Sequence, residues 1–155
     1  MQVVLITGCG SGLGKALARS FKQAAFAGEP SGFRVFASDL NLDSIKDLRI
    51  EGIEVLTLDV TNAESVQRGV SHIEQEAGRL DVLICNAGIV TIAPLIEEEL
   101  SEIQAVWNVN TCGTASIASL FLQTCKLCLS LALPYCSCIS VCMLHSHVIP
   151  VHLRQ

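Results

Sequence analysis

Short apolar runs alternate with segments of helical periodicity along residues 1–124 of this 155-residue chain. A run of about four to eight apolar or β-branched residues that ends at glycine or polar residues is typical of a buried strand. Apolar residues that recur every three or four positions are typical of an amphipathic helix. The pattern predicts four strands, over residues 1–7, 34–38, 53–58 and 80–85.

A helix is predicted directly after the first strand. Four apolar residues at helical spacing are expected on one face of it, and the turn-forming residues at 28–32 end the element. These four residues are Leu13, Ala16, Leu17 and Phe21.

Three more helices are predicted further along the chain. A short one covers 43–48, a second begins at a capping box formed by Thr61 and Glu64, and a long one covers about 101–124. The helix that begins at the capping box is expected to turn Val66, Val70 and Ile73 inward. The long helix over about 101–124 carries Ile103, Val106, Trp107 and Asn110 along one side.

Strands that alternate with helices indicate βαβ units. Right-handed crossovers then build a parallel sheet covered on both faces, so the expected fold class is α/β, a three-layer doubly wound parallel sheet. Ligands of such folds bind outside the carboxyl ends of the strands, where the strand order reverses. The candidate residues after the strands are Thr7 to Gly14, Asp39, Asp59, Val60, and Asn86 to Gly88.

Composition narrows the class of protein. Hydrophobic residues make up 50% of the chain and charged residues 16%, which is enough apolar material for the core of one domain and argues against a disordered chain. A net charge of -5 argues against a nucleic-acid partner, which requires a basic surface. Because Gly8 to Gly14 interrupt the opening apolar segment, no leader peptide is expected, and a cytoplasmic setting with free thiols is predicted.

Residues 125–155 differ in kind from the rest. All 15 acidic residues precede residue 103, whereas five of the 8 cysteines lie in this last stretch. The chain therefore divides into one domain over 1–124 and an atypical, cysteine-rich apolar tail over 125–155.

The tail admits several interpretations. Three pairs have the ligand types of a zinc site, but their spacings fit no single zinc-finger pattern, so no metal site is expected. These pairs are Cys125 with Cys128, Cys136 with Cys138, and His145 with His147. The stretch 127–153 lacks Lys, Arg, Asp and Glu and is long enough for a membrane span, but its proline, serines and histidines argue against insertion. A strand and helix packed on the sheet, or a disordered apolar tail, are the alternatives.

A glycine-rich segment joins the first strand to the first helix. Glycines allow close approach of the backbone to a ligand, and a helix N-terminus presents unpaired N–H groups, so a diphosphate fits there. The mononucleotide P-loop pattern fails because it needs a glycine at Cys9 and a hydroxyl at Ala16, and G-x-G-x-x-G fails at Leu13. A helix entry that binds nothing is the alternative.

The segment does match T-G-x-x-x-G-x-G, and here the chain resembles the short-chain dehydrogenase/reductase family. The resemblance extends over residues 2 to about 124 and implies a Rossmann-like NAD(P)-binding domain that is incomplete at its C-terminal side. The cofactor-binding residues it implies in this segment are Thr7, Gly8, Ser11, Gly12, Leu13 and Gly14.

Acidic residues after the second and third strands add to the resemblance. Asp39 stands where a carboxylate can accept hydrogen bonds from the adenosine ribose and repel a 2′-phosphate, which favours NAD, with NADP as the alternative. Asp59 and Val60 resemble the family marker that contacts the adenine ring. The other interpretation of Asp39 is a helix-cap or turn aspartate, and that of Asp59 is plain helix capping, which is compatible with the adenine contact.

Two further segments resemble the family on the nicotinamide side. Asn86, Ala87 and Gly88 match the end of its N-N-A-G motif, with Cys85 replacing the first asparagine and removing one polar anchor. Asn110 stands where the family places a catalytic asparagine. Otherwise, an asparagine within a helix faces solvent or bonds to its own turn.

The family's catalytic Tyr-x-x-x-Lys motif has no counterpart. Its lysine lowers the pKa of the tyrosine from about 10, so that the phenol can exchange a proton near neutral pH. The single tyrosine, Tyr135, is followed four residues later by Ile139, and no lysine occurs after Lys126. Ser137 or Ser140 would approach the position of the family's serine only if residues around them formed a fifth strand.

The sequence therefore predicts an NAD(P)-dependent oxidoreductase of this family, which transfers hydride to or from a small-molecule alcohol or ketone, in a form that lacks the catalytic motif. A homodimer or heterodimer through the helix at 101–124 is expected by resemblance. The alternatives are a non-catalytic nucleotide-binding or dimerisation partner, and a poorly folding fragment whose fourth strand is an exposed edge.

Overall fold

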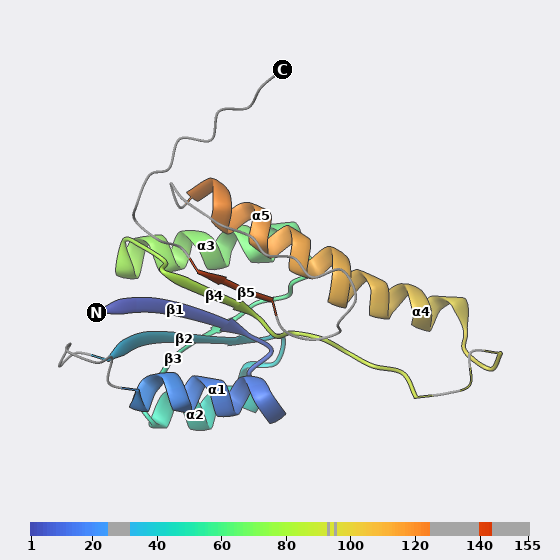
Figure 1. The fold of residues 1–155 in the computed structure, drawn as a ribbon, viewed down its shortest axis with the longest axis horizontal. Helices are drawn as coiled ribbons and strands as arrows, with labels where there is room; N and C mark the ends of the chain where they lie inside the picture. Colours follow the sequence, from blue (N-terminus) through green and yellow to red (C-terminus); the bar gives the residue numbers. More distant parts are fainter. Residues whose placement is uncertain (25–31, 93, 95, 125–139, 144–155) are drawn as a thin grey trace, which may run out of the picture.

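One sheet organises the computed structural model of the protein, which describes residues 1–24, 32–92, 94, 96–124 and 140–143 (Figure 1). The strand order is β3-β2-β1-β4-β5. The four strands expected from the apolar runs are confirmed, with ends shifted by one or two residues. The strands are β1 (Gln2–Thr7), β2 (Phe33–Asp39), β3 (Glu54–Thr57), β4 (Val82–Cys85) and β5 (Ser140–Met143).

Helices cover both faces of the sheet, as a doubly wound fold requires (Figure 1). Helices α1 (Gly12–Gln23) and α2 (Lys46–Ile50) lie on one face, and α3 (Ala63–Ala77) and α5 (Thr114–Thr124) lie on the other. Side chains of β1 alternate between the two cores, because successive residues of a strand point to opposite faces. Val4 and Ile6 join the α1 side, whereas Val3 and Leu5 join the α3 side.

The strand order reverses on either side of β1. This strand pairs in parallel with β2 on one edge and with β4 on the other, so that Thr7 lies opposite Ser38 and Ile6 lies opposite Ile84. The carboxyl ends of three strands therefore meet at one place, which is where this class of fold binds its ligands.

The start of α3 differs from the expected capping box. Asn62 is the N-cap, and its side chain accepts a hydrogen bond from the Ser65 amide at 2.9 Å. Thr61 lies one residue before the cap, and both its amide and its hydroxyl donate to the carboxylate of Asp59. The inward residues Val66, Val70 and Ile73 are buried as expected.

The buried face of α1 also differs from the expected one. Gly14 and Ala18 are its buried residues, and Leu17 and Phe21 are half-buried against the same core. Leu13 is 51% exposed, and Ala16 is exposed as well. The reason is that α1 turns its glycine toward the sheet, which rotates the apolar stripe away from position 13.

The helices predicted over 43–48 and about 101–124 are each divided into different helical types. The short one is a 3-10 turn, η1 (Leu42–Ile45), that continues into α2. The long one consists of α4 (Leu100–Trp107), a π-helical segment η2 (Asn108–Gly113) and α5. A π-helical segment inside a longer helix often marks a functional position.

Helix α4 has no buried residue, in contrast to α5. Its expected apolar side is exposed, with Ile103 at 37% and Trp107 at 62%. Figure 1 shows that α5 lies over the sheet, whereas α4 extends past the carboxyl ends of the strands. An apolar helical side therefore faces outward.

Strand β5 pairs with β4 in the antiparallel direction, with Cys85 opposite Ser140. It lies along the edge of β4 that the sequence alone would leave open. Several residues considered in the sequence analysis lie outside the described part of the chain. They are Tyr135, Ser137, the cysteine and histidine pairs weighed as a zinc site, and most of the stretch weighed as a membrane span. Among the described residues, no helix is long and apolar enough to cross a membrane, and no cluster of side chains forms a metal site.

Candidate functional site

The glycine-rich segment after β1 leaves no room for a side chain at Gly8 or Gly14. A Cβ on Gly8 would lie 2.6 Å from the Cα of Ala87, and a Cβ on Gly14 would lie 2.3 Å from the carbonyl oxygen of Gly8. Gly8 also has a φ of 68° and Gly12 a φ of 53°, in the left-handed region that favours glycine. Close packing and backbone conformation together explain why glycine occupies these three positions.

The start of α1 is open to a ligand. Ser11 is the N-cap, but its side chain makes no capping hydrogen bond, so the first-turn amides are not satisfied by that hydroxyl. Ser11, Gly12 and Leu13 are exposed, and nothing lies within 4 Å of a Cβ placed on Gly12. Unpaired amides and the partial positive charge of a helix N-terminus are suited to an anion.

The segment after β4 is held against the glycine turn by hydrogen bonds. The Thr7 hydroxyl oxygen accepts the amides of Asn86 and Ala87, both at 3.0 Å. The side-chain amide of Asn86 donates to the carbonyl oxygens of Thr7 and Gly8, at 2.9 and 3.0 Å. Asn86 and Ala87 therefore lie directly beside the turn, as expected from the sequence.

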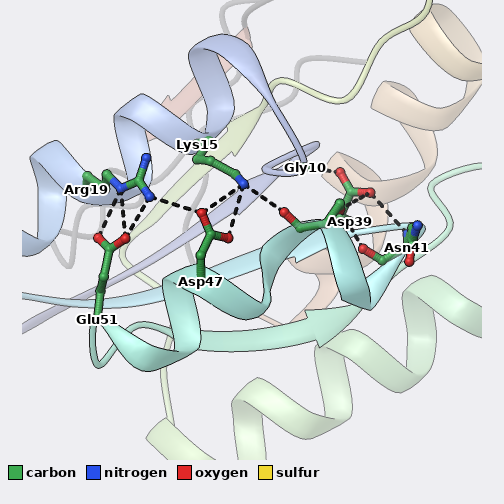
Figure 2. A network of polar contacts seen from close by, with 8 residues as sticks. Gly10, Lys15, Arg19, Asp39, Asn41, Asp47 and Glu51 are labelled. Atoms are coloured by element: carbon green, nitrogen blue, oxygen red, sulfur yellow. Dashed lines mark hydrogen bonds and ion pairs between the residues drawn. The ribbon is translucent and has the colours of Figure 1, made fainter.

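Asp39 reaches the glycine turn from the end of β2 (Figure 2). Its Oδ2 accepts the amide of Gly10 at 2.7 Å, and its Oδ1 accepts the amide of Asn41 at 3.1 Å. The second contact is that of a turn aspartate, while the cap of η1 is Asn41, which accepts from the Asp43 amide. Asp39 thus fills the turn role that the sequence offered as an alternative, and its carboxylate lies beside the glycine turn.

Gly10 lies within the candidate range Thr7 to Gly14, but its contact with Asp39 was not expected from the sequence. A Cβ at this position would lie 2.7 Å from Asp39 Oδ2 and 2.7 Å from the Ser44 hydroxyl oxygen. The signal available in the sequence was a glycine at a position that the motif leaves free. Only the structure shows that the carboxylate of Asp39 requires the space.

Asp59 and Val60 come after β3 and approach the same end of the sheet. The carboxylate of Asp59 accepts the amide of Thr61 at 2.9 Å and its hydroxyl at 2.7 Å. Val60 is buried against the π-helical segment, where a Cβ on Gly113 would lie 2.7 Å from its Cγ2. Asp59 therefore shapes a turn, and the interpretation as a helix cap is wrong, because Asn62 has that role.

Asn110 is fixed by a reciprocal pair of hydrogen bonds. Its Oδ1 accepts the amide of Ile89 and its Nδ2 donates to the carbonyl oxygen of Ile89, both at 2.9 Å. Gly88 is adjacent, since a Cβ there would lie 3.3 Å from Asn110 Oδ1. The side chain thus bonds to the segment after β4 rather than to its own turn or to solvent alone.

Two cysteines near the site are buried. Burial raises the pKa of the Cys9 thiol to about 12, and its sulfur lies 3.2 Å from the carbonyl oxygen of Ile6. A thiol that stays protonated is a poor nucleophile. Cys85, at the end of β4, is also buried.

The site residues thus gather at one end of the sheet, from five segments of the chain. Uncapped helix amides, an adjacent carboxylate and a tightly packed glycine turn form a donor set that fits a diphosphate joined to a ribose. The residues present therefore fit a dinucleotide.

Comparisons with known proteins agree with this arrangement. The sequence profile described as "short chain dehydrogenase" matches residues 2–127. Among curated relatives, estradiol 17-beta-dehydrogenase 1 of Rattus norvegicus is 38% identical over 134 residues, which cover 80% of this chain and 37% of the relative. The NADPH-dependent 1-acyldihydroxyacetone phosphate reductase of Schizosaccharomyces pombe is 36% identical over 126 residues, which cover 77% of this chain and 39% of the relative.

Solved structures give the same result for the fold. A short-chain dehydrogenase from Streptomyces avermitilis superposes with a TM-score of 0.70 at 26% identity, covering 81% of this chain and 45% of that one. The chain spans well under half the length of the two curated relatives above. The matched part contains the glycine turn, Asp39, Asp59, Asn86 and Asn110.

Proposed function

The chain belongs to the short-chain dehydrogenase family, and on that premise we propose that it binds a nicotinamide adenine dinucleotide at the carboxyl ends of its parallel strands. The observation that carries the proposal is the contact between the Gly10 amide and Asp39 Oδ2 at 2.7 Å. This contact brings a carboxylate suited to ribose hydroxyls next to a helix N-terminus suited to phosphate.

The diphosphate is assigned to the turn and the first residues of α1. The exposed backbone at the helix start comes from Ser11, Gly12 and Leu13. The turn itself is held in place by the packing of Thr7, Gly8 and Gly14. The absence of a capping side chain supports this assignment, because an anion can then take the free amides.

The adenosine end is assigned to Asp39, Asp59 and Val60. A carboxylate has about four acceptor positions, and Asp39 uses three of them for Gly10, Asn41 and Ser44. At least one position is left for a ribose hydroxyl. A 2′-phosphate would meet the same negative charge, so we propose NAD as the preferred cofactor and NADP as the weaker one.

The nicotinamide end is assigned to Asn86, Ala87, Gly88 and Asn110. A bound nicotinamide supplies or accepts hydride, and in the whole family protein the substrate would be an alcohol or ketone. Here Asn110 orients the backbone of Ile89, which comes directly after Gly88. Without Tyr-x-x-x-Lys, loss of general acid and base catalysis would lower the rate about 10² to 10⁴-fold.

A second candidate function is that of a non-catalytic partner, which pairs with a second copy or with a longer relative in the cytoplasm. The exposed apolar side of α4, with Trp107 at 62%, supports it. Co-expression with a tagged full-length relative tests this candidate. Recovery of both chains in one complex supports it, and recovery of the tagged chain alone contradicts it.

Titration of NADH fluorescence against the purified chain tests the proposed function. The wild-type chain is expected to bind NADH more tightly than NADPH. Asp39→Asn keeps the size of the side chain but removes its charge, and should weaken NADH binding and narrow the difference between the two cofactors. Absence of a signal at millimolar concentrations of either cofactor contradicts the proposal.

A further inference from the structure

We propose that Lys15 is a positioning residue for the ribose end of this site, acting through the backbone of Ser44 rather than by contact with the cofactor. The inference rests on the proposed function, since it concerns how Asp39 is held for a ribose. Lys15 lies in α1, just after the last glycine of the turn, and matches no position of the family motif.

The ammonium group of Lys15 joins α1 to the segment after β2 (Figure 2). Its Nζ lies 2.8 Å from the carbonyl oxygen of Ser44 and 3.1 and 3.0 Å from the two carboxylate oxygens of Asp47. The side chain is 21% exposed, so these contacts are partly shielded from water. The ammonium group of Lys15 is thus directed at Ser44 and Asp47.

Ser44 lies directly beside Asp39. Its hydroxyl oxygen is 3.2 Å from Asp39 Oδ1 and 2.6 Å from the carbonyl oxygen of Asn41, so its single proton is shared between these two acceptors. Movement of the Ser44 backbone would therefore move a group that packs against the proposed ribose-binding carboxylate.

Two hydrogen bonds tie the two segments together at matched positions. Gly10 bonds to Asp39 and Lys15 bonds to Ser44, and both pairs are separated by 29 residues along the chain. The Cys9 amide also donates to the Ser38 carbonyl oxygen at 2.9 Å, so the start of the segment after β2 is held independently of Lys15. The bond from Lys15 holds the same segment further along, at Ser44, whose hydroxyl contacts Asp39.

The charge of Lys15 is already matched by the protein. An ammonium group has three donors, and the contacts with Ser44 and Asp47 use them. In agreement, the hydrogen bond from Lys15 lowers the pKa of the Asp47 carboxyl below its ordinary value. Lys15 is therefore not free to pair with a 2′-phosphate.

Arg19 provides a matched control on the same helix. It contacts Asp47 at 3.0 Å and Glu51 at 2.6 Å, and so also joins α1 to α2. Unlike Lys15, it has no contact with Ser44 or Asp39 among its hydrogen bonds. Loss of Arg19 removes these two ion pairs without releasing the bond that holds Ser44.

The experiment compares Lys15→Met, Lys15→Arg and Arg19→Met with the wild-type chain by NADH and NADPH fluorescence titration. Lys15→Met is expected to weaken NADH binding about tenfold, Lys15→Arg to recover part of that loss, and Arg19→Met to stay within about twofold of wild type. Without cofactor, amide hydrogen exchange over 40–45 should be faster in Lys15→Met than in Arg19→Met.

Each remaining outcome contradicts either the positioning role of Lys15 or the proposed dinucleotide binding. Equal NADH affinity and equal exchange in Lys15→Met and Arg19→Met would overturn the positioning role. A loss confined to NADPH would make Lys15 a phosphate ligand and overturn it as well. A wild-type chain that binds neither dinucleotide contradicts the proposed function, and with it the role of Lys15 in cofactor binding.

Discussion

Thr7 and Asn86, at the ends of two neighbouring strands, are joined by two hydrogen bonds that run in the same direction. The amide of Asn86 donates to the Thr7 hydroxyl at 3.0 Å, and its side chain donates to the Thr7 carbonyl at 2.9 Å. The hydroxyl oxygen accepts the amide of Ala87 as well. One threonine therefore sets the position of the segment after β4 relative to the glycine turn.

Replacing Thr7 with valine is expected to destabilise the fold by about 1 to 3 kcal/mol, because two amides next to a buried side chain lose their acceptor. Thr7→Ser keeps the acceptor and should cost less. Urea denaturation of both variants measures the difference. If valine and serine gave the same free energy of unfolding, the hydroxyl would have no structural role.

Gly14→Ala should abolish dinucleotide binding, because the new Cβ would lie 2.3 Å from the carbonyl oxygen of Gly8 and displace the turn. The control is Gly78→Ala at the C-cap of α3. Gly78 has a φ of 69° and open space around it, so alanine there should cost about 1 kcal/mol of stability and leave binding unchanged. The NADH affinities of the two variants are compared by titration. If Gly14→Ala bound NADH as tightly as wild type, the diphosphate would not bind at the glycine turn.

Asn110→Ala should release the segment after β4. It removes both hydrogen bonds to the Ile89 backbone, at an expected cost of about 1 to 2 kcal/mol. Faster amide exchange at Ile89 and weaker NADH binding are the measured outcomes. Asn108→Ala, at an exposed position of the same π-helical segment, is the control, and equal exchange at Ile89 in both variants would contradict the positioning role.

Cys9 should resist alkylation in the native protein, whereas the exposed Cys112 should react with iodoacetamide near pH 8. Burial raises the pKa of Cys9 from 9.0 to about 12, so the folded state favours the neutral thiol. The neutral Cys9 thiol therefore contributes to the free energy of unfolding below pH 9, and this contribution is lost as the pH rises toward 12. Peptide mapping by mass spectrometry measures how fast each thiol is alkylated. Rapid labelling of Cys9 in the folded protein would contradict its burial.

Local pattern was sufficient to predict most of the fold. The strands and the inward side of α3 are explained by apolar runs and helical spacing, and the packing of the core agrees with them. The errors came from tertiary context. The face of α1 depends on how closely Gly14 packs against Gly8, and the start of α3 depends on the hydrogen bond from the Ser65 amide to the Asn62 side chain.

The site was predicted from the residues at the carboxyl end of each strand, since parallel strands bring these ends together. The contacts of Gly10, Lys15 and Ser44 were not predicted. They join residues about 30 positions apart through single hydrogen bonds, which leave no periodic signal in a sequence. The outward-facing side of α4 was not predicted either, because spacing shows that a stripe is apolar but not what covers it.

A crystal structure of the chain soaked with NAD tests the central claim most directly. We predict that the diphosphate lies against the amides at the start of α1 and that a hydroxyl of the adenosine ribose lies within hydrogen-bonding distance of Asp39. A map in which Asp39 keeps only its contacts with Gly10, Asn41 and Ser44, with no density for the dinucleotide beside the glycine turn, would contradict the account.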